Sequence, residues 1–270
     1  SGPFTSEAEL RDLVDQAHER GLVESDEHEM IHSVFELGDT LVRELMVPRT
    51  DMVWIEKDKT LRQGLSLALR SGFSRIPVVG TGPDNIIGIV YVKDLARRAL
   101  DHHEAEQTEN IEQHMRPATF VPEIKMADEL LKEMQRNQIH LAVVVDEYGG
   151  TAGIITIEDI IEEIVGEIED EFDDGEDDFV WLSPDKARAN ASLHIEDLAD
   201  ELKIEINESD FEDVDTIGGL MAQKLGRVPI AGSTVSLHGW SITSERPIGR
   251  RRRISSVLIE RLEKEIEDHE

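Results

Sequence analysis

The sequence contains no cysteine, and this absence removes several classes of protein at once. Disulfide scaffolds, thiolate zinc sites, iron–sulfur clusters and cysteine nucleophiles are all excluded. Positive charge is also scarce, because 28 Lys and Arg stand against 59 Asp and Glu, which gives a net charge of -31. A broad nucleic-acid interface needs clustered Lys and Arg to replace the counterions of phosphates, so the sequence predicts no nucleic-acid partner.

Long apolar runs are absent as well. No stretch approaches the roughly 18–20 consecutive apolar residues that a membrane helix requires, and the longest runs, 86–92 and 141–145, have the length of buried strands. The sequence does not begin with Met and shows no signal-peptide pattern. We therefore expect a fragment or a processed form of a longer protein. Its 270 residues suggest two or three domains.

An internal repeat is the most informative feature that is present. Met46-Val47-Pro48 is echoed by Met115-Arg116-Pro117, at an offset of 69 residues. The segments 75–79 and 88–94 are echoed by 140–144 and 153–159, at an offset of 65. Each copy reads as a short strand, an amphipathic helix, two apolar strands and a closing helix, which is a β-α-β-β-α unit. So small a unit shelters its sheet poorly, so we expect the two copies to pack together.

The apolar spacing gives the details of each copy. The first strands are expected at 52–55 and 119–121, and the stripes of the helices that follow are Leu61, Leu65, Ala68 and Leu69 in the first copy and Met126, Leu130, Leu131 and Met134 in the second. The closing helix of the second copy is expected to place Ile160, Ile161, Ile164, Val165 and Ile168 on one side. Residues 4–43 are predicted to be helical with a break near Gly21. After an acidic tract, 179–262 alternates strand-like and helical segments, such as 195–202 and 217–225, and predicts a small α+β domain.

Thr156-x-x-Asp159 opens a helix directly after a strand, and two interpretations remain open. The pattern is typical of a capping box, in which the hydroxyl and the carboxylate satisfy free backbone N–H groups. It also suits a nucleotide, because the hydroxyl and the helix N-terminus can contact phosphate while Asp159 binds the two hydroxyls of a ribose. In the first copy Tyr91 stands at the Thr156 position and Asp94 remains. We therefore predict one competent and one degenerate nucleotide site per chain.

Basic residues beside hydroxyls point to the phosphate side of that site. Ser74-Arg75-Ile76-Pro77 offers a guanidinium for phosphate and an apolar wall for a purine, although an ordinary surface arginine before a buried strand is an equal alternative. Arg49 and Thr50 form a similar pair at a strand entrance.

Catalytic and metal-binding motifs are not recognisable, so the sequence predicts a protein that is not an enzyme. His28 and His32 are four residues apart on a predicted helix but have no third ligand nearby in the sequence, and His102-His103-Glu104 reads as a solvated loop. The acidic tract 162–178 could attract Mg²⁺, although such runs are usually solvated linkers. The run Arg250–Arg253 reads as a hairpin turn or strand end, with a latch onto the acidic tract or a lipid contact as the minority interpretation.

The repeat resembles a tandem pair of CBS (cystathionine β-synthase type) domains. Finer motifs resemble the CorC/HlyC family of Mg²⁺ and Co²⁺ transport proteins, which is similar to the eukaryotic CNNM proteins. They are the segments 47–52, 72–78, 144–150 and 156–168, followed by 215–220 and 226–229 in a region that resembles the family's transporter-associated domain. The expected organisation is an N-terminal helical connector at 1–43, CBS domains at 44–105 and 106–168, an acidic linker at 169–178, and the transporter-associated domain at 179–270.

The resemblance implies a ligand and the residues that hold it. The family's CBS pair binds ATP, usually with Mg²⁺, and dimerises through its CBS layers. On the matching positions Thr156 and Asp159 would hold phosphate and ribose, Ser74 and Arg75 would contact phosphate or ribose, and Ile76 and Pro77 would line the adenine. Arg49 and Thr50 would close the phosphate end, and Phe73 and Ile154 complete the expected set. No residue is assigned to a direct metal site.

Three functions are compatible with these features of the sequence. The leading expectation is the cytosolic regulatory region of a CorC-type transporter, in which MgATP binding controls cation export from the cytoplasmic face of the cell membrane through an upstream membrane domain. The alternative is a soluble adenine-nucleotide-sensing accessory protein that docks on a separate transporter, and apolar segments of ~20 residues encoded upstream would favour the first. The third, a nucleotide hydrolase, is disfavoured because no general base or nucleophile falls in the expected cleft.

Overall fold

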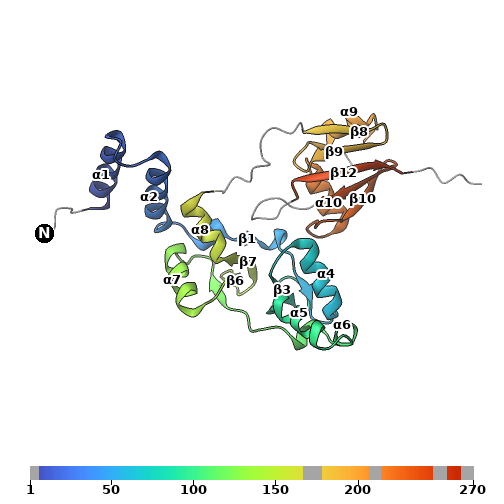
Figure 1. Cartoon of the computed structure of the whole chain (residues 1–270), viewed down its shortest axis with the longest axis horizontal. Coiled ribbons are helices and arrows are strands. Elements are labelled where there is room, and N and C mark those ends of the chain that lie inside the picture. The colour runs from blue at the N-terminus through green and yellow to red at the C-terminus, as the bar shows by residue number, and fades with distance from the viewer. Residues whose placement is uncertain (1–5, 167–177, 207–213, 246–253, 263–270) are drawn as a thin grey trace, which may run out of the picture. The chain divides into compact units, whose positions relative to one another are not determined.

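The computed structural model describes residues 6–166, 178–206, 214–245 and 254–262, and it divides into two compact units (Figure 1). The first unit comprises 1–52, 79–88 and 117–168, and the second comprises 53–78, 89–116 and 169–270. In the described part of the chain, no helix is both long enough and apolar enough to span a lipid bilayer.

The second repeat forms most of the first unit. Its elements follow the predicted order: β5 (Phe120–Pro122), α7 (Ala127–Asn137), β6 (Leu141–Val145), β7 (Thr151–Thr156) and α8 (Ile157–Val165). β5 runs parallel to β6, and β6 runs antiparallel to β7. The two helices cover this sheet with apolar side chains that pack into one core, which includes Val121, Leu130, Met134, Ala142, Val144, Ile155 and Ile160. Burial of these side chains is the main force that holds the repeat together.

Three helices precede the first repeat in the sequence: α1 (Glu7–Glu19), α2 (Ser25–Leu37) and α3 (Val42–Leu45). The predicted break is confirmed at Gly21, whose positive φ of 69° lets the chain turn after α1. α2 packs against α8, and Leu37 at its end joins the core of the second repeat. The turn between the helices brings α1 and α2 against each other as a helical hairpin.

The first repeat shows the same order of elements. They are β2 (Ile55–Glu56), α4 (Leu61–Ser71), β3 (Arg75–Val79), β4 (Ile86–Tyr91) and α5 (Val92–Asp101). The strands form a three-stranded sheet in the order β2-β3-β4, and α6 (Ala105–Thr108) and η2 (Ile111–Gln113) follow. The predicted β-α-β-β-α unit is therefore confirmed in both copies.

Some details of the sequence prediction are wrong. Met126, which was expected on the apolar stripe of the second helix, is the N-cap of α7 and is 38% exposed. The strand expected at 52–55 begins only at Ile55, because the chain first makes the 3-10 turn η1 (Arg49–Asp51). Leu69 is 82% exposed, since the buried face of α4 is formed by Leu61, Gly64 and Ala68 and the next position lies outside it. Val165 is likewise 39% exposed at the last turn of α8.

The Met-x-Pro segments are exchanged between the repeats. β1 (Val47–Pro48) belongs by sequence to the first repeat but pairs antiparallel with β7, so the sheet order is β1-β7-β6-β5. Val47 lies opposite Ile154, and at the equivalent position Arg116 forms a bridge to Ile89 of β4. Each sheet is therefore completed by the segment that leads into the other copy.

The C-terminal α+β region contains a five-stranded antiparallel sheet in the order β10-β11-β12-β9-β8. The strands are β8 (Phe179–Ser183), β9 (Lys186–Asn190), β10 (Thr234–Leu237), β11 (Trp240–Ser244) and β12 (Ser256–Arg261). Helices α9 (Ile195–Leu202) and α10 (Ile217–Leu225) have the predicted bounds. Their apolar faces pack on the sheet in one core that contains Leu198, Leu220, Trp240 and Ile242.

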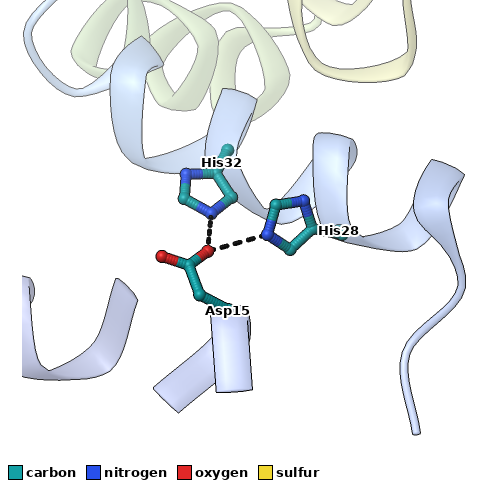
Figure 2. Close-up of side chains that lie close together, drawn as sticks. All are labelled: Asp15, His28 and His32. Atoms are coloured by element: carbon teal, nitrogen blue, oxygen red, sulfur yellow. Dashed lines mark hydrogen bonds and ion pairs between the residues drawn. The ribbon is translucent and has the colours of Figure 1, made fainter. Parts of the chain in front are cut away.

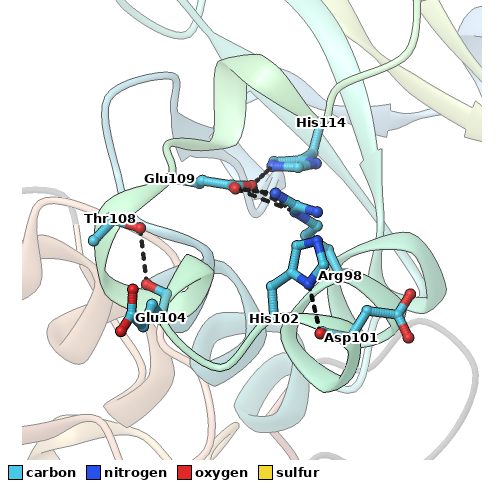
Figure 3. Close-up of polar contacts among 7 residues, drawn as sticks. All are labelled: Arg98, Asp101, His102, Glu104, Thr108, Glu109 and His114. Carbon is cyan, nitrogen blue, oxygen red and sulfur yellow. Dashed lines mark hydrogen bonds and ion pairs between the residues drawn. The ribbon is translucent and has the colours of Figure 1, made fainter.

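An ionic cluster braces the end of the first repeat (Figure 3). Glu109, which follows α6, accepts a hydrogen bond of 2.9 Å from Nε of Arg98 on α5, and its other partner is Nε2 of His114 at 2.6 Å. The hydrogen bonds from Arg98, more than those from His114, hold the pKa of the Glu109 carboxyl at about 2, against a usual value of 4.5. The folded chain therefore stabilises the ionised carboxylate of Glu109 more than the unfolded chain does.

The cluster predicts a specific pH dependence of stability. A carboxyl whose pKa is depressed on folding stabilises the fold above pH 4.5, and this contribution is lost as the pH falls from 4.5 towards 2. Glu109→Gln is therefore expected to lower the midpoint of thermal unfolding at neutral pH, and the difference from the wild type should shrink below pH 4.5. Circular dichroism over a pH series measures this. Glu112→Gln, at an exposed ion pair with Lys57, should show a smaller and flatter difference.

Candidate functional site

The capping box predicted at the start of α8 is confirmed. The backbone N–H of Thr156 donates to Oδ2 of Asp159 at 2.7 Å, and the backbone N–H of Asp159 donates to the Thr156 hydroxyl at 3.1 Å. The hydroxyl in turn donates to the same carboxylate oxygen at 2.6 Å. Both side chains are half-buried, so the helix begins with a carboxylate and a hydroxyl held rigidly at the end of β7.

In the first unit, Ile154 is part of β7, and the turn that carries Arg49 and Thr50 lies against that strand. Ile154 lies on β7 opposite Val47, and η1, which carries Arg49 and Thr50, follows β1 directly and lies against β7. Both η1 side chains are exposed, and Arg49 forms an ion pair with Asp84. Exchange of the Met-x-Pro segment is thus what places residues 49–50 beside the strand that leads to Thr156 and Asp159.

The remaining predicted residues form one continuous run in the second unit. α4 ends at Gly72 in the left-handed conformation (φ 71°), which turns the chain into Phe73 and Ser74. The carbonyl oxygen of Ser74 accepts a hydrogen bond from the N–H of Val92 at 3.0 Å, and the Ser74 side chain is exposed. Arg75 is the first residue of β3, and its guanidinium carbon lies 5.8 Å from the centroid of the Tyr91 ring. The next two residues, Ile76 and Pro77, are buried.

The equivalent of the capping box in the first repeat is closed by neighbouring side chains. Tyr91 occupies the N-cap position of α5 and makes no side-chain cap, as predicted. The Arg116 guanidinium lies 4.3 Å from the centroid of the Tyr91 ring, and its Nε donates to Oδ2 of Asp94 at 2.9 Å. The carboxylate that corresponds to Asp159 is therefore neutralised within its own unit by an arginine of the exchanged segment.

Sequence reasoning missed the third member of a histidine cluster. His28 and His32 on α2 both contact Oδ1 of Asp15 on α1, at 2.7 Å and 2.9 Å. The hydrogen bond with His28, and next that with His32, lower the pKa of the Asp15 carboxyl. Asp15 lies thirteen residues before His28, too far away for a local motif to link them. The feature of the sequence that could have predicted the contact is the short turn at Gly21, which brings two antiparallel helices face to face.

The remaining motifs singled out in the sequence are either exposed or lie outside the described residues. His102, His103 and Glu104 are exposed between α5 and α6, where Nδ1 of His102 contacts the carbonyl oxygen of Asp101 (Figure 3). Ile168, most of the acidic tract (167–177), and Arg250–Arg253 lie outside the described residues.

Comparison with known proteins identifies the class of both halves. The family model of the CBS domain matches residues 42–101 and 111–166, and that of the transporter associated domain, CorC_HlyC, matches 182–263. The fold is therefore that of a CBS pair followed by a C-terminal sheet domain.

Individual relatives identify the family to which the chain belongs. The magnesium and cobalt efflux protein CorC of Salmonella typhimurium is 37% identical over 86% of this chain and 78% of its own length. A UPF0053 protein of Mycobacterium tuberculosis is 50% identical over the whole chain, which spans 62% of the length of that relative. A solved CBS domain of the bacterial CNNM/CorC family Mg²⁺ transporter is 46% identical over 62% of this chain and all of its own, with a TM-score of 0.57. The chain belongs to the CorC/HlyC family.

Proposed function

We propose that this chain is the regulatory region of a CorC-type Mg²⁺ and Co²⁺ efflux transporter, and that it binds ATP with Mg²⁺ in the CBS pair to control cation export. The observation that carries the proposal is the capping box of Thr156 and Asp159 at the end of β7. The turn η1, with Arg49 and Thr50, lies against the same strand, beyond Gly153 towards the start of β7. A guanidinium and hydroxyls suit the phosphates, and a carboxylate suits the ribose hydroxyls, so the donor set of the first unit fits the sugar and phosphates of a nucleotide.

The capping box explains how the two roles of Thr156 and Asp159 are compatible. Without ligand the Thr156 hydroxyl donates to Asp159. When the ribose hydroxyls donate to that carboxylate, the Thr156 hydroxyl can rotate its proton towards a phosphate oxygen, while the Asp159 N–H continues to cap the helix. We further propose that Ile76 and Pro77 line the adenine and that Ser74 and Arg75 contact phosphate or ribose. Mg²⁺ accompanies the triphosphate because bringing its charge to so acidic a protein is costly without a counter-cation.

The site in the first repeat is proposed to stay empty of nucleotide. Asp94 is paired with Arg116, and Tyr91 offers neither a cap nor a small hydroxyl. The proposal therefore requires one ATP per chain. We further propose that the chain dimerises through its CBS domains, works at the cytoplasmic face of the cell membrane, and passes the ATP-bound arrangement to a membrane domain by differential affinity for two dimer states.

The test is isothermal titration calorimetry of ATP with and without Mg²⁺. We expect one ATP per chain, bound more tightly with Mg²⁺, and an affinity about 10- to 100-fold lower in Asp159→Asn, because charge-assisted hydrogen bonds of about 1.5–3 kcal/mol are lost. Asp94→Asn is the matched control at the equivalent position and should bind like the wild type. Affinity that is indifferent to Asp159, or equally sensitive to Asp94, would reject the assignment. Steady release of phosphate from ATP would favour a hydrolase instead.

A second variant tests the phosphate end. Arg49 is held by Asp84 in the structure, and both side chains are exposed. A phosphate must compete with Asp84 for the guanidinium, so Asp84→Asn is expected to raise ATP affinity by about two- to fivefold, the size of an exposed ion pair of up to ~1 kcal/mol. The hydrogen bond from Thr151 to the Asp84 backbone carbonyl is retained. Asp58→Asn removes the same charge from an exposed turn and should leave affinity unchanged. Equal gains in both variants would mean that only net charge matters.

A further inference from the structure

Three side chains of the N-terminal helical hairpin converge on one point (Figure 2). Asp15 projects from α1, and His28 and His32 project from α2, with Nε2 of each imidazole against the same carboxylate oxygen, Oδ1. All three candidate ligand atoms lie within 4.8 Å of one another. Among the residues that the structure describes, no other such group of His, Asp and Glu was found.

The local structure fixes this arrangement. A spacing of four residues puts His28 and His32 on one face of α2, and the short turn at Gly21 returns the chain so that α1 faces them. The neighbouring His18 contacts the carbonyl oxygen of Val23 through Nδ1 at 3.0 Å and stacks on His28 with ring centroids 4.6 Å apart. The His28 ring is thus in contact with two other imidazoles, since the ring centroid of His32 is 4.5 Å away.

We propose that Asp15, His28 and His32 form a binding site for a divalent transition-metal ion of the Zn²⁺ or Co²⁺ class. Two imidazole nitrogens and one carboxylate oxygen are a ligand set of these borderline ions. Mg²⁺ is not expected there, because it takes oxygen ligands and keeps its waters. The metal would replace the hydrogen bonds to Oδ1, and water would complete its coordination.

The geometry requires only a small opening. With metal–ligand bonds of about 2.0–2.1 Å, the ligand atoms of a tetrahedral site stand about 3.3 Å apart. Here Oδ1 of Asp15 is 2.7 Å and 2.9 Å from the two Nε2 atoms, which lie within 4.8 Å of each other. Side-chain rotation supplies the difference. The side chains of His28 and His32 are 24% and 25% exposed and that of Asp15 is 49% exposed, so an ion can reach the site from solvent. Once bound, it would link α1 to α2.

The experiment uses the whole chain, freed of metal with EDTA and without nucleotide. Calorimetry with ZnCl₂ should show one site per chain, and His28→Gln, His32→Gln and Asp15→Asn should each weaken it at least about tenfold. His103→Gln removes an exposed histidine elsewhere and should bind like the wild type. Added Co²⁺ should give the intense visible absorption of a four-coordinate ion in the wild type and not in His28→Gln/His32→Gln. Excess MgCl₂ should not displace it.

Two results would overturn the proposal. One is the same Zn²⁺ affinity in the double variant as in the wild type, which would place the ion on other acidic residues. The other is the absence of saturable binding in the wild type. Circular dichroism in EDTA identifies any variant that has lost helix, and Asp15→Asn, which keeps the shape of the side chain, then decides the result. ATP binding is measured separately, so its failure and the failure of the metal site remain distinguishable.

Discussion

Replacing Gly153 with alanine is expected to lower the free energy of unfolding by about 1–3 kcal/mol, as overpacking of a tight interior contact does. Gly153 lies on β7 opposite Pro48 of β1. A Cβ atom there would overlap the carbonyl oxygen of Val47 and lie 3.1 Å from Sδ of Met46. The obstructing atom belongs to the backbone, so the contact is relieved only if β1 moves away from β7.

Gly64→Ala is the matched control for this variant. Its Cβ would meet Cδ1 of Ile111 at 2.6 Å and Cδ1 of Leu95 at 3.1 Å, but these are the ends of side chains and can rotate. Urea unfolding followed by circular dichroism should therefore show a smaller loss for Gly64→Ala. Gly153→Ala should also weaken ATP binding, because displacement of β1 carries Arg49 and Thr50 with it. Equal losses of stability and unchanged ATP affinity would contradict this account of β1.

Trp240→Ala is expected to cost about 3–5 kcal/mol in the C-terminal domain. The Trp240 side chain is 5% exposed within the core between β10 and β12. Its ring lies 5.9 Å from that of Trp181 and 5.5 Å from the guanidinium carbon of Arg261. Loss of so large a buried surface leaves a cavity that the surrounding strands cannot fill.

Trp181→Ala provides the comparison for Trp240→Ala. Trp181 is 42% exposed at the edge strand β8, so its removal should cost much less in urea unfolding. Both variants should bind ATP like the wild type, because every proposed contact lies in the CBS pair. Loss of ATP binding in Trp240→Ala alone would show that the C-terminal domain supports the nucleotide site.

Local patterns predicted local structure well. The capping box joins Thr156 and Asp159, which are three positions apart, so its hydrogen bonds follow from sequence spacing alone. The bounds of α9 and α10 and the repeated β-α-β-β-α order were predicted for the same reason, since apolar periodicity reports which face of an element is buried. The error at Leu69 arose because an apolar stripe only two helical turns long does not show how wide the buried face of the helix is.

Partners that are distant in sequence were not predicted. Alternating apolar and polar residues identify a strand but do not show which strand pairs with it. The pairing of Val47 with Ile154 therefore had no local signal in the sequence. The ion pair of Arg49 with Asp84 joins residues 35 apart, and the contact of Asp15 with His32 crosses between two helices. The candidate site was thus predicted as a set of facing motifs, and the groups that hold its side chains in place, such as Asp84 beside Arg49, were missed.

The exchange of the Met-x-Pro segments also sets an order of events during synthesis on the ribosome. β1 leaves the ribosome long before its partner, because Val47 and Ile154 are 107 residues apart. At about 5–20 residues per second, roughly 5–20 s pass before β7 is available. The first repeat reaches its own missing segment only when Arg116 has been made. The nascent chain therefore carries β1 without a partner over this interval, and a translational stop between the repeats releases a product in which β1 has no strand to pair with.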